Sequence, residues 1–244
     1  AVGNFSLGSN TSGNNNVALG LSSLCGNTSG CYNTALGRNA LRCNTTANSN
    51  VAVGYESLKV NTTGTENTAV GKDSLKLSTT AIQNTAVGTS SLRDNTTGTE
   101  NTAVGFNSLV QSTTGSCNTS IGKESLFSNT TADNNTAVGV EALKDNTTGT
   151  VNTAMGRQAL QNNTTADGNT AYGHNSLNTV TTGGCNTAVG GSALFNNTGT
   201  GNVAVGHSVL QANTSASDNV GMGRNALYTN TEGHSNVGIG RNAL

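Results

Sequence analysis

The chain has 244 residues, of which 9% are charged and 3% aromatic, and its formal net charge is −1. Glycine supplies 32 residues and there is no proline or tryptophan, so the large side chains that fill a thick globular core are scarce. The near-zero charge gives no electrostatic basis for binding nucleic acid. No apolar run reaches the roughly 18–20 residues that a membrane span requires.

A short motif recurs along the whole chain. Residues 67–75 return as residues 84–92 and 101–109, and each copy contains a glycine after a large apolar residue. From Gly3 to Gly240 these glycines are 17 residues apart, except for a step of 16 between Gly190 and Gly206. A fixed period indicates stacked repeats that bury themselves against their neighbours. We predict an all-β parallel β-solenoid (β-roll) of about fifteen 17-residue rungs, forming one continuous domain over residues 1–244. Because the chain begins and ends within a repeat, we expect it to be a window from a longer fibre.

Each rung is expected to begin with a short strand, as in residues 67–70. Thr68 and Val70 are separated by Ala69, which is the period of a strand with one buried face, and we assign Thr68 and Val70 to that face. Gly71 then permits a bend or a positive φ. Leu75 follows, and we expect a second short strand or a turn to deliver it to the same thin core. In three central rungs the predicted core positions are Val53, Gly54, Leu58, Val70, Gly71, Leu75, Val87, Gly88 and Leu92.

The rest of the rung, such as residues 61–66, consists of turn-forming residues and is expected to be an exposed loop. Seven residues after many of the glycines an asparagine begins an Asn-x-Ser/Thr sequence, which is the acceptor for N-glycosylation. These candidates are Asn10, Asn27, Asn44, Asn61, Asn95, Asn129, Asn146, Asn163 and Asn213. The alternative interpretation is a ladder of turn-forming asparagines that bond the backbone from rung to rung.

The five cysteines suggest at most one bridge within the chain. Cys25 and Cys43 fall almost in one column on neighbouring rungs, so a disulfide between them is a candidate, with free thiols as the alternative. Cys117 and Cys185 share a column but lie four rungs apart, which is too far for a bond. No zinc signature or calcium-binding repeat is present, and we predict no metal and no cofactor.

The stacked basic residues and the histidines are two further groups with the chemistry of a site. The basic residues Arg42, Lys59, Lys76 and Arg93 occupy one position in successive rungs, which indicates a solvated face or a contact for an anionic sugar. The repeat places no histidine beside a nucleophile and an acidic partner, so we predict no catalytic residues and no enzyme.

The runs Asn-Val-Ala-Val-Gly at residues 50–54 and 202–206 resemble the head repeats of trimeric autotransporter adhesins. The longer pattern Asn-Thr-Ala-Val-Gly-x-x-Ser-Leu-x-x-Asn-Thr-Thr-Gly looks like repeat arrays of tail-fibre-type proteins of phages and bacteria. The resemblance implies a parallel β-roll wound by three identical chains into an extracellular fibre. The adhesin head repeat is shorter than the repeat of this chain.

From these observations we predict a structural role. The expected function is an extracellular adhesin-like or tail-fibre-like shaft, a stiff rod that presents Asn/Thr-rich loops at a cell surface or on a virion. One alternative is a repeat module that binds glycans or ice, and another is a self-assembling, glycosylated surface filament. The expected partners are other copies of the chain, as a homotrimer or filament, together with glycans or a cell-surface receptor.

Overall fold

The computed structural model describes residues 1–244, which form two compact units, Ala1–Ser120 (unit 1) and Ile121–Leu244 (unit 2). Both units are built from three-residue strands joined by turns, and neither contains a helix. No segment of the structure is therefore a helix of the length and hydrophobicity that crossing a membrane requires.

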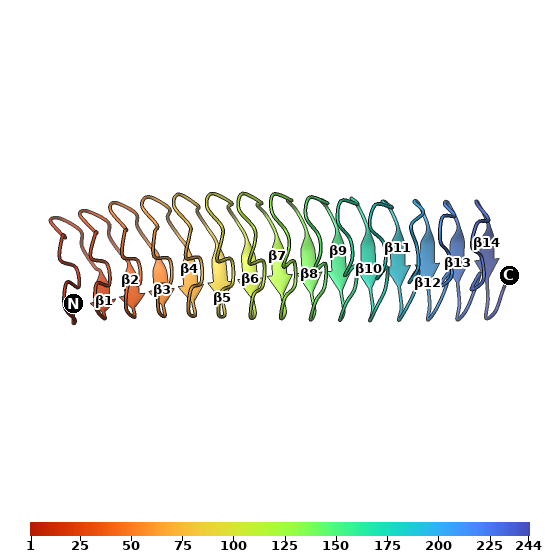
Figure 1. Ribbon diagram of the computed structural model, residues 1–244, viewed down its shortest axis with the longest axis horizontal. Helices are drawn as coiled ribbons and strands as arrows, with labels where there is room; N and C mark the ends of the chain where they lie inside the picture. The colour runs from red at the N-terminus through yellow and green to blue at the C-terminus, as the bar shows by residue number, and fades with distance from the viewer. The chain divides into compact units, whose positions relative to one another are not determined.

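The strands pair in chain order within each unit (Figure 1). In unit 1, β1 to β6 form consecutive parallel pairs, and residue i of one strand lies beside residue i+17 of the next. In unit 2, β8 to β14 do the same, with a step of 16 between β11 and β12. The strands are β1 Val17–Leu19, β2 Thr34–Leu36, β3 Val51–Val53, β4 Thr68–Val70, β5 Thr85–Val87, β6 Thr102–Val104, β7 Thr119–Ile121, β8 Thr136–Val138, β9 Thr153–Met155, β10 Thr170–Tyr172, β11 Thr187–Val189, β12 Val203–Val205, β13 Val220–Met222 and β14 Val237–Ile239.

The parallel β-solenoid with a 17-residue rung is thus confirmed. The rung count differs slightly from the prediction, because fifteen repeat glycines give fourteen strands. The segment before Gly3 contributes only an isolated bridge between Val2 and Leu19.

The strand alternates as expected, but its phase is the opposite of the predicted one. Ala69 is fully buried, Thr68 and Val70 are half-buried, and Val87 is 37% exposed. The prediction that Val53, Val70 and Val87 form the core is therefore wrong. The reason is the width of the interior: a Cβ placed at Gly238 in β14 would lie 2.7 Å from Cγ of Leu227 on the facing wall. Only a small residue fits on the strand side of such a narrow space.

The facing wall is a column of leucines carried on turns. Leu58, Leu75 and Leu92 are fully buried, and no second strand forms around them. Leu75 has a φ of 47° and Asp73 a φ of 56°, a left-handed backbone that non-glycine residues seldom adopt. Burial of the leucine side chain, worth roughly 1.5–3 kcal/mol, offsets the cost of this conformation.

Backbone bonds between rungs continue through the turn. The amide of Leu75 donates to the carbonyl of Ser91 in the next rung at 3.1 Å, and the amide of Asp73 donates to Tyr55 in the preceding rung at 2.9 Å. The loop stacks in the same way, since the Thr62 hydroxyl donates to the Thr79 carbonyl at 3.1 Å. Each rung is therefore bonded to its neighbours through the strand, the turn and the loop.

Candidate functional site

The sequon asparagines form a ladder inside the wall of the solenoid. In unit 1, Nδ2 of Asn44 donates to Oδ1 of Asn27 at 2.8 Å and to the carbonyl of Ala47 at 3.1 Å. Nδ2 of Asn61 donates to Oδ1 of Asn44 at 3.0 Å in the same way. We call this series, seven residues after each repeat glycine, the first asparagine column.

The first column contradicts the prediction of an exposed glycosylation stripe. The side-chain nitrogen that would carry a glycan is consumed by hydrogen bonds, and eight of the nine candidates are fully buried: Asn27, Asn44, Asn61, Asn95, Asn129, Asn146, Asn163 and Asn213. The candidate Asn10 is exposed, although its Oδ1 accepts from Nδ2 of Asn27 at 2.8 Å. The loop bends inward at these residues because an asparagine can satisfy the carbonyl three residues later and its neighbour in the stack together.

A second asparagine column, which was not predicted, lies immediately before the strands. Nδ2 of Asn84 donates to Oδ1 of Asn67 at 3.1 Å and to the carbonyl of Gly98 at 3.0 Å. Its Oδ1 accepts from the backbone amide and from Nδ2 of Asn101, at 3.0 and 3.2 Å. The signal was available, because asparagine occupies this position in every rung: Asn16, Asn33, Asn50, Asn67, Asn84, Asn101, Asn118, Asn135, Asn152, Asn169, Asn186, Asn202, Asn219 and Asn236.

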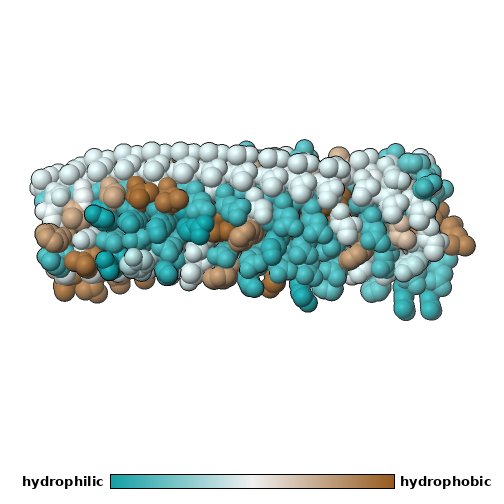
Figure 2. All heavy atoms as spheres, in the orientation of Figure 1, coloured by the Kyte–Doolittle hydropathy of each residue, from teal (hydrophilic) through white to brown (hydrophobic).

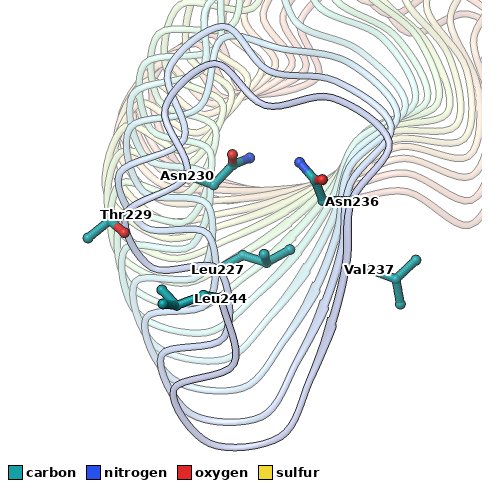
Figure 3. A pocket seen from close by; sticks show the side chains of 6 residues that line it. All are labelled: Leu227, Thr229, Asn230, Asn236, Val237 and Leu244. Atoms are coloured by element: carbon teal, nitrogen blue, oxygen red, sulfur yellow. The ribbon is translucent and has the colours of Figure 1, made fainter.

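The two columns face one another across the interior, as the view into unit 2 shows (Figure 3). Asn230 of the first column and Asn236 of the second point toward one another from opposite walls, and Leu227 points inward below them. Val237, the first residue of β14, points away from the interior. These residues, with Thr229 and Leu244, line a cavity of about 380 Å³. The cavity is the inside of the last turns and not a hollow in the side of the stack.

Charged residues on the turns of unit 1 form a ladder of ion pairs. Oε1 of Glu56 lies 2.8 Å from Nζ of Lys59, and its Oε2 lies 2.8 Å from Nζ of Lys76 in the next rung. Lys76 also pairs with Oδ1 of Asp73 at 3.1 Å, and Arg93 pairs with Asp94 at 2.7 Å. Carboxylates thus neutralise three of the four stacked basic residues, Lys59, Lys76 and Arg93. Arg42, the fourth, has no ion pair.

A smaller ladder of the same kind lies in unit 2. Nζ of Lys144 lies 2.9 Å from Oε2 of Glu124 and 3.9 Å from Oε1 of Glu141. Gln158 extends the series, because its Nε2 donates to Oε2 of Glu141 at 2.8 Å. In both ladders a lysine pairs with a glutamate of the preceding rung, Lys76 with Glu56 and Lys144 with Glu124, and the other ion pairs lie within one rung.

The ion pairs of Glu56 predict acid sensitivity. Hydrogen bonds from Lys59 and Lys76 lower the pKa of Glu56 to about 2. Because the folded pKa is below the unfolded value, the stabilisation is complete above about pH 4.5 and is lost as the pH falls toward 2. We expect Glu56→Gln to cost about 1 kcal/mol at pH 7, after solvent screening, and almost nothing at pH 2. Thermal unfolding of both forms across this pH range measures the difference.

Glu232→Gln, at an exposed glutamate without an ion pair, is the control. Its stability difference from the wild type should be small at every pH. An equal loss of stability for the Glu56 and Glu232 variants would contradict the role of the ladder.

All five cysteines are free thiols, so the predicted bridge between Cys25 and Cys43 is not formed. The two residues stand in adjacent columns rather than one: the amide of Gly26, not of Cys25, donates to the carbonyl of Arg42, and the amide of Cys43 donates to Lys59. No group of three or more His, Cys, Asp or Glu side chains is placed to hold a metal ion.

The outer face of the strands differs from the turns because it carries no charge. Each strand directs its first and third residues outward, and in all fourteen strands these are Thr, Val, Leu, Ile, Met or Tyr. We call these two columns the strand face. Ile121, Tyr172, Val189 and Met222 are between 38% and 52% exposed on it. In contrast, Figure 2 presents a face on which hydrophilic side chains predominate and hydrophobic ones form small separate groups.

The candidate functional features are therefore the strand face, the ion-pair ladders and the loops, since the asparagines predicted as surface sites belong to the interior. No protein-family model, no curated protein and no solved structure matches the chain.

Proposed function

We propose that this chain is a structural segment of an extracellular fibre, adhesin-like or tail-fibre-like, at a cell surface or on a virion. In this proposal three copies associate through their strand faces and present their loops outward. The observation that carries it is the strand face, an uncharged surface with large apolar side chains in register on successive strands. Contiguous exposed apolar surface of this kind is typical of protein–protein interfaces.

The remaining side chains fit a structural role. The leucines, the buried alanines and both asparagine columns hold one rung against the next, and the exposed loop residues are mainly Thr, Ser and Asn. A stack bonded at every rung transmits force along its axis without a thick core. The resemblance to adhesin head repeats is consistent with this arrangement, and the proposed partners beyond other copies are glycans or a surface receptor.

The mass in solution tests the proposal. We expect light scattering to give about three times the chain mass for the wild type. Val70→Lys combined with Val87→Lys places two charges on the strand face and should give the mass of one chain with unchanged circular dichroism. Thr80→Lys combined with Thr97→Lys, on the exposed loop, is the matched control and should leave the trimer intact. A wild-type chain of monomeric mass contradicts the trimer, whereas a mass that grows with concentration supports the self-assembling filament.

The strand face also favours a second candidate, a module that binds a regular lattice such as ice or a repeating glycan. The sequence placed the conspicuous threonine pairs in the loop, but the structure adds outward threonines on the strands, as in β4, β5 and β6. Hydroxyl and methyl groups then repeat about every 4.8 Å along the stack. Ice-recrystallisation and glycan-array assays decide between the candidates, and inhibition of recrystallisation that is lost on Thr85→Lys would support the second.

A further inference from the structure

The first asparagine column is interrupted at three rungs, and the interruptions leave buried polar atoms without partners. Where one asparagine follows another, Nδ2 of the later residue donates to Oδ1 of the earlier one, as between Asn61 and Asn44. Ser78, Ser112 and Val180 replace asparagine in the column. Oδ1 of the preceding residue has no protein partner at each of these places, namely in Asn61, Asn95 and Asn163.

At Ser78 three groups face the interruption, all on fully buried residues. Oδ1 of Asn61 and Oγ of Ser78 have no hydrogen-bond partner in the protein. Nδ2 of Asn95 donates only to the carbonyl of Gly98, at 3.0 Å, whereas Nδ2 of Asn44 donates to two acceptors. The interruption thus offers one acceptor, one hydroxyl and one spare amide hydrogen.

These groups match the bonding capacity of a water molecule. A serine side chain has two heavy atoms fewer than asparagine, so the interruption removes the volume of most of a carboxamide. Buried waters in proteins make about three hydrogen bonds to polar groups that otherwise lack partners. We propose that the wall of unit 1 binds a water molecule beside Ser78, which donates to Asn61, bonds the Ser78 hydroxyl and accepts from Asn95. A second water beside Ser112 donates to Asn95 and bonds the Ser112 hydroxyl.

Val180 provides an internal comparison in unit 2. Its side chain fills part of the space with methyl groups and brings no donor or acceptor. A water there would have Oδ1 of Asn163 and the spare amide hydrogen of Asn197, whose Nδ2 donates only to the carbonyl of Gly199 at 2.9 Å, as partners, but no hydroxyl. A valine side chain has only one heavy atom fewer than asparagine, so its methyl groups occupy most of the space that serine leaves free, and the proposal assigns no water to the Val180 rung.

The test is a count of long-lived buried waters by oxygen-17 and deuterium relaxation dispersion. Ser78→Asn and Ser112→Asn complete the ladder, and each should lower the count by one and raise the unfolding temperature. Together they should lower the count by two. Ser29→Asn, the same substitution on the exposed loop, and Val180→Asn, in the dry rung, should leave the count unchanged.

An unchanged count in the double variant would overturn the proposal, as would an equal fall in the Ser29 variant. If the double variant does not fold, the electron density of the wild-type protein beside Ser78 and Ser112 decides. A peak within hydrogen-bond distance of Asn61 and Ser78 supports the proposal, and its absence at high resolution refutes it.

Discussion

Replacement of Asn84 by leucine, in the second asparagine column of unit 1, is expected to produce a large loss of stability. The leucine keeps a similar volume but removes every polar contact of the side chain. The backbone amide of Asn101 then loses its side-chain acceptor, and the carbonyl of Gly98 keeps only its bond from Nδ2 of Asn95. The unpaired amide costs about 1–3 kcal/mol and each further hydrogen bond that is lost costs about 0.5–1.5 kcal/mol, so we expect a total of about 3–6 kcal/mol. Chemical denaturation, monitored by circular dichroism, measures this loss of stability.

The matched control is Asn14→Leu, at an exposed asparagine of the same unit whose side chain makes no hydrogen bond. That variant should differ from the wild type by about 0.5 kcal/mol or less. If Asn84→Leu unfolds at the same denaturant concentration as Asn14→Leu, the buried ladder does not stabilise the stack.

The second large effect is expected at the repeat glycines. Gly54 has a φ of 132°, and a Cβ added to it would lie 2.5 Å from the carbonyl oxygen and 2.7 Å from the carbonyl carbon of Gly71. Gly54→Ala therefore combines backbone strain of about 1–3 kcal/mol with a steric clash of about 1–3 kcal/mol. We expect a loss of about 2–6 kcal/mol, which is a substantial part of the stability of an ordinary domain. Thermal and chemical unfolding of the variant measure this quantity.

Gly8→Ala is the control for this experiment. Its φ is not positive, and a Cβ there would have the Phe5 carbonyl at 3.4 Å as its nearest neighbour. The variant should be as stable as the wild type or slightly more stable, because alanine restricts the unfolded chain. Equal stability of the Gly54 and Gly8 variants would show that the rungs move apart to admit a side chain.

The period of the sequence was sufficient to predict the stacking. Because glycine and leucine return after 17 residues, equivalent residues had to lie beside one another, and the register of Thr68 with Thr85 follows directly. The ion-pair ladder follows from the same register, since it brings Glu56 and Lys76 onto neighbouring turns.

The asparagines show where the sequence was ambiguous. An Asn-x-Thr sequence on an exposed loop and one inside a wall have the same letters, and the first column was open to both interpretations. Asn61 and Asn95 turned out to be interior: both are fully buried, and their side-chain amides donate to the carbonyls of Gly64 and Gly98 in their own loops.

The sequence by itself therefore determined the repeat, the parallel pairing in register and the buried leucines, because these depend only on spacing. The tertiary structure decided which strand face is the inner one. An alternating strand can turn either Val70 or Ala69 toward the interior. Ala69 is the inner residue because Leu75 and its neighbours on the opposite wall already fill the space. The distance between the two walls is set by the packing of the turn against the strand, so the sequence pattern alone does not reveal it. The same packing directs the asparagines inward and leaves an uncharged strand face outside.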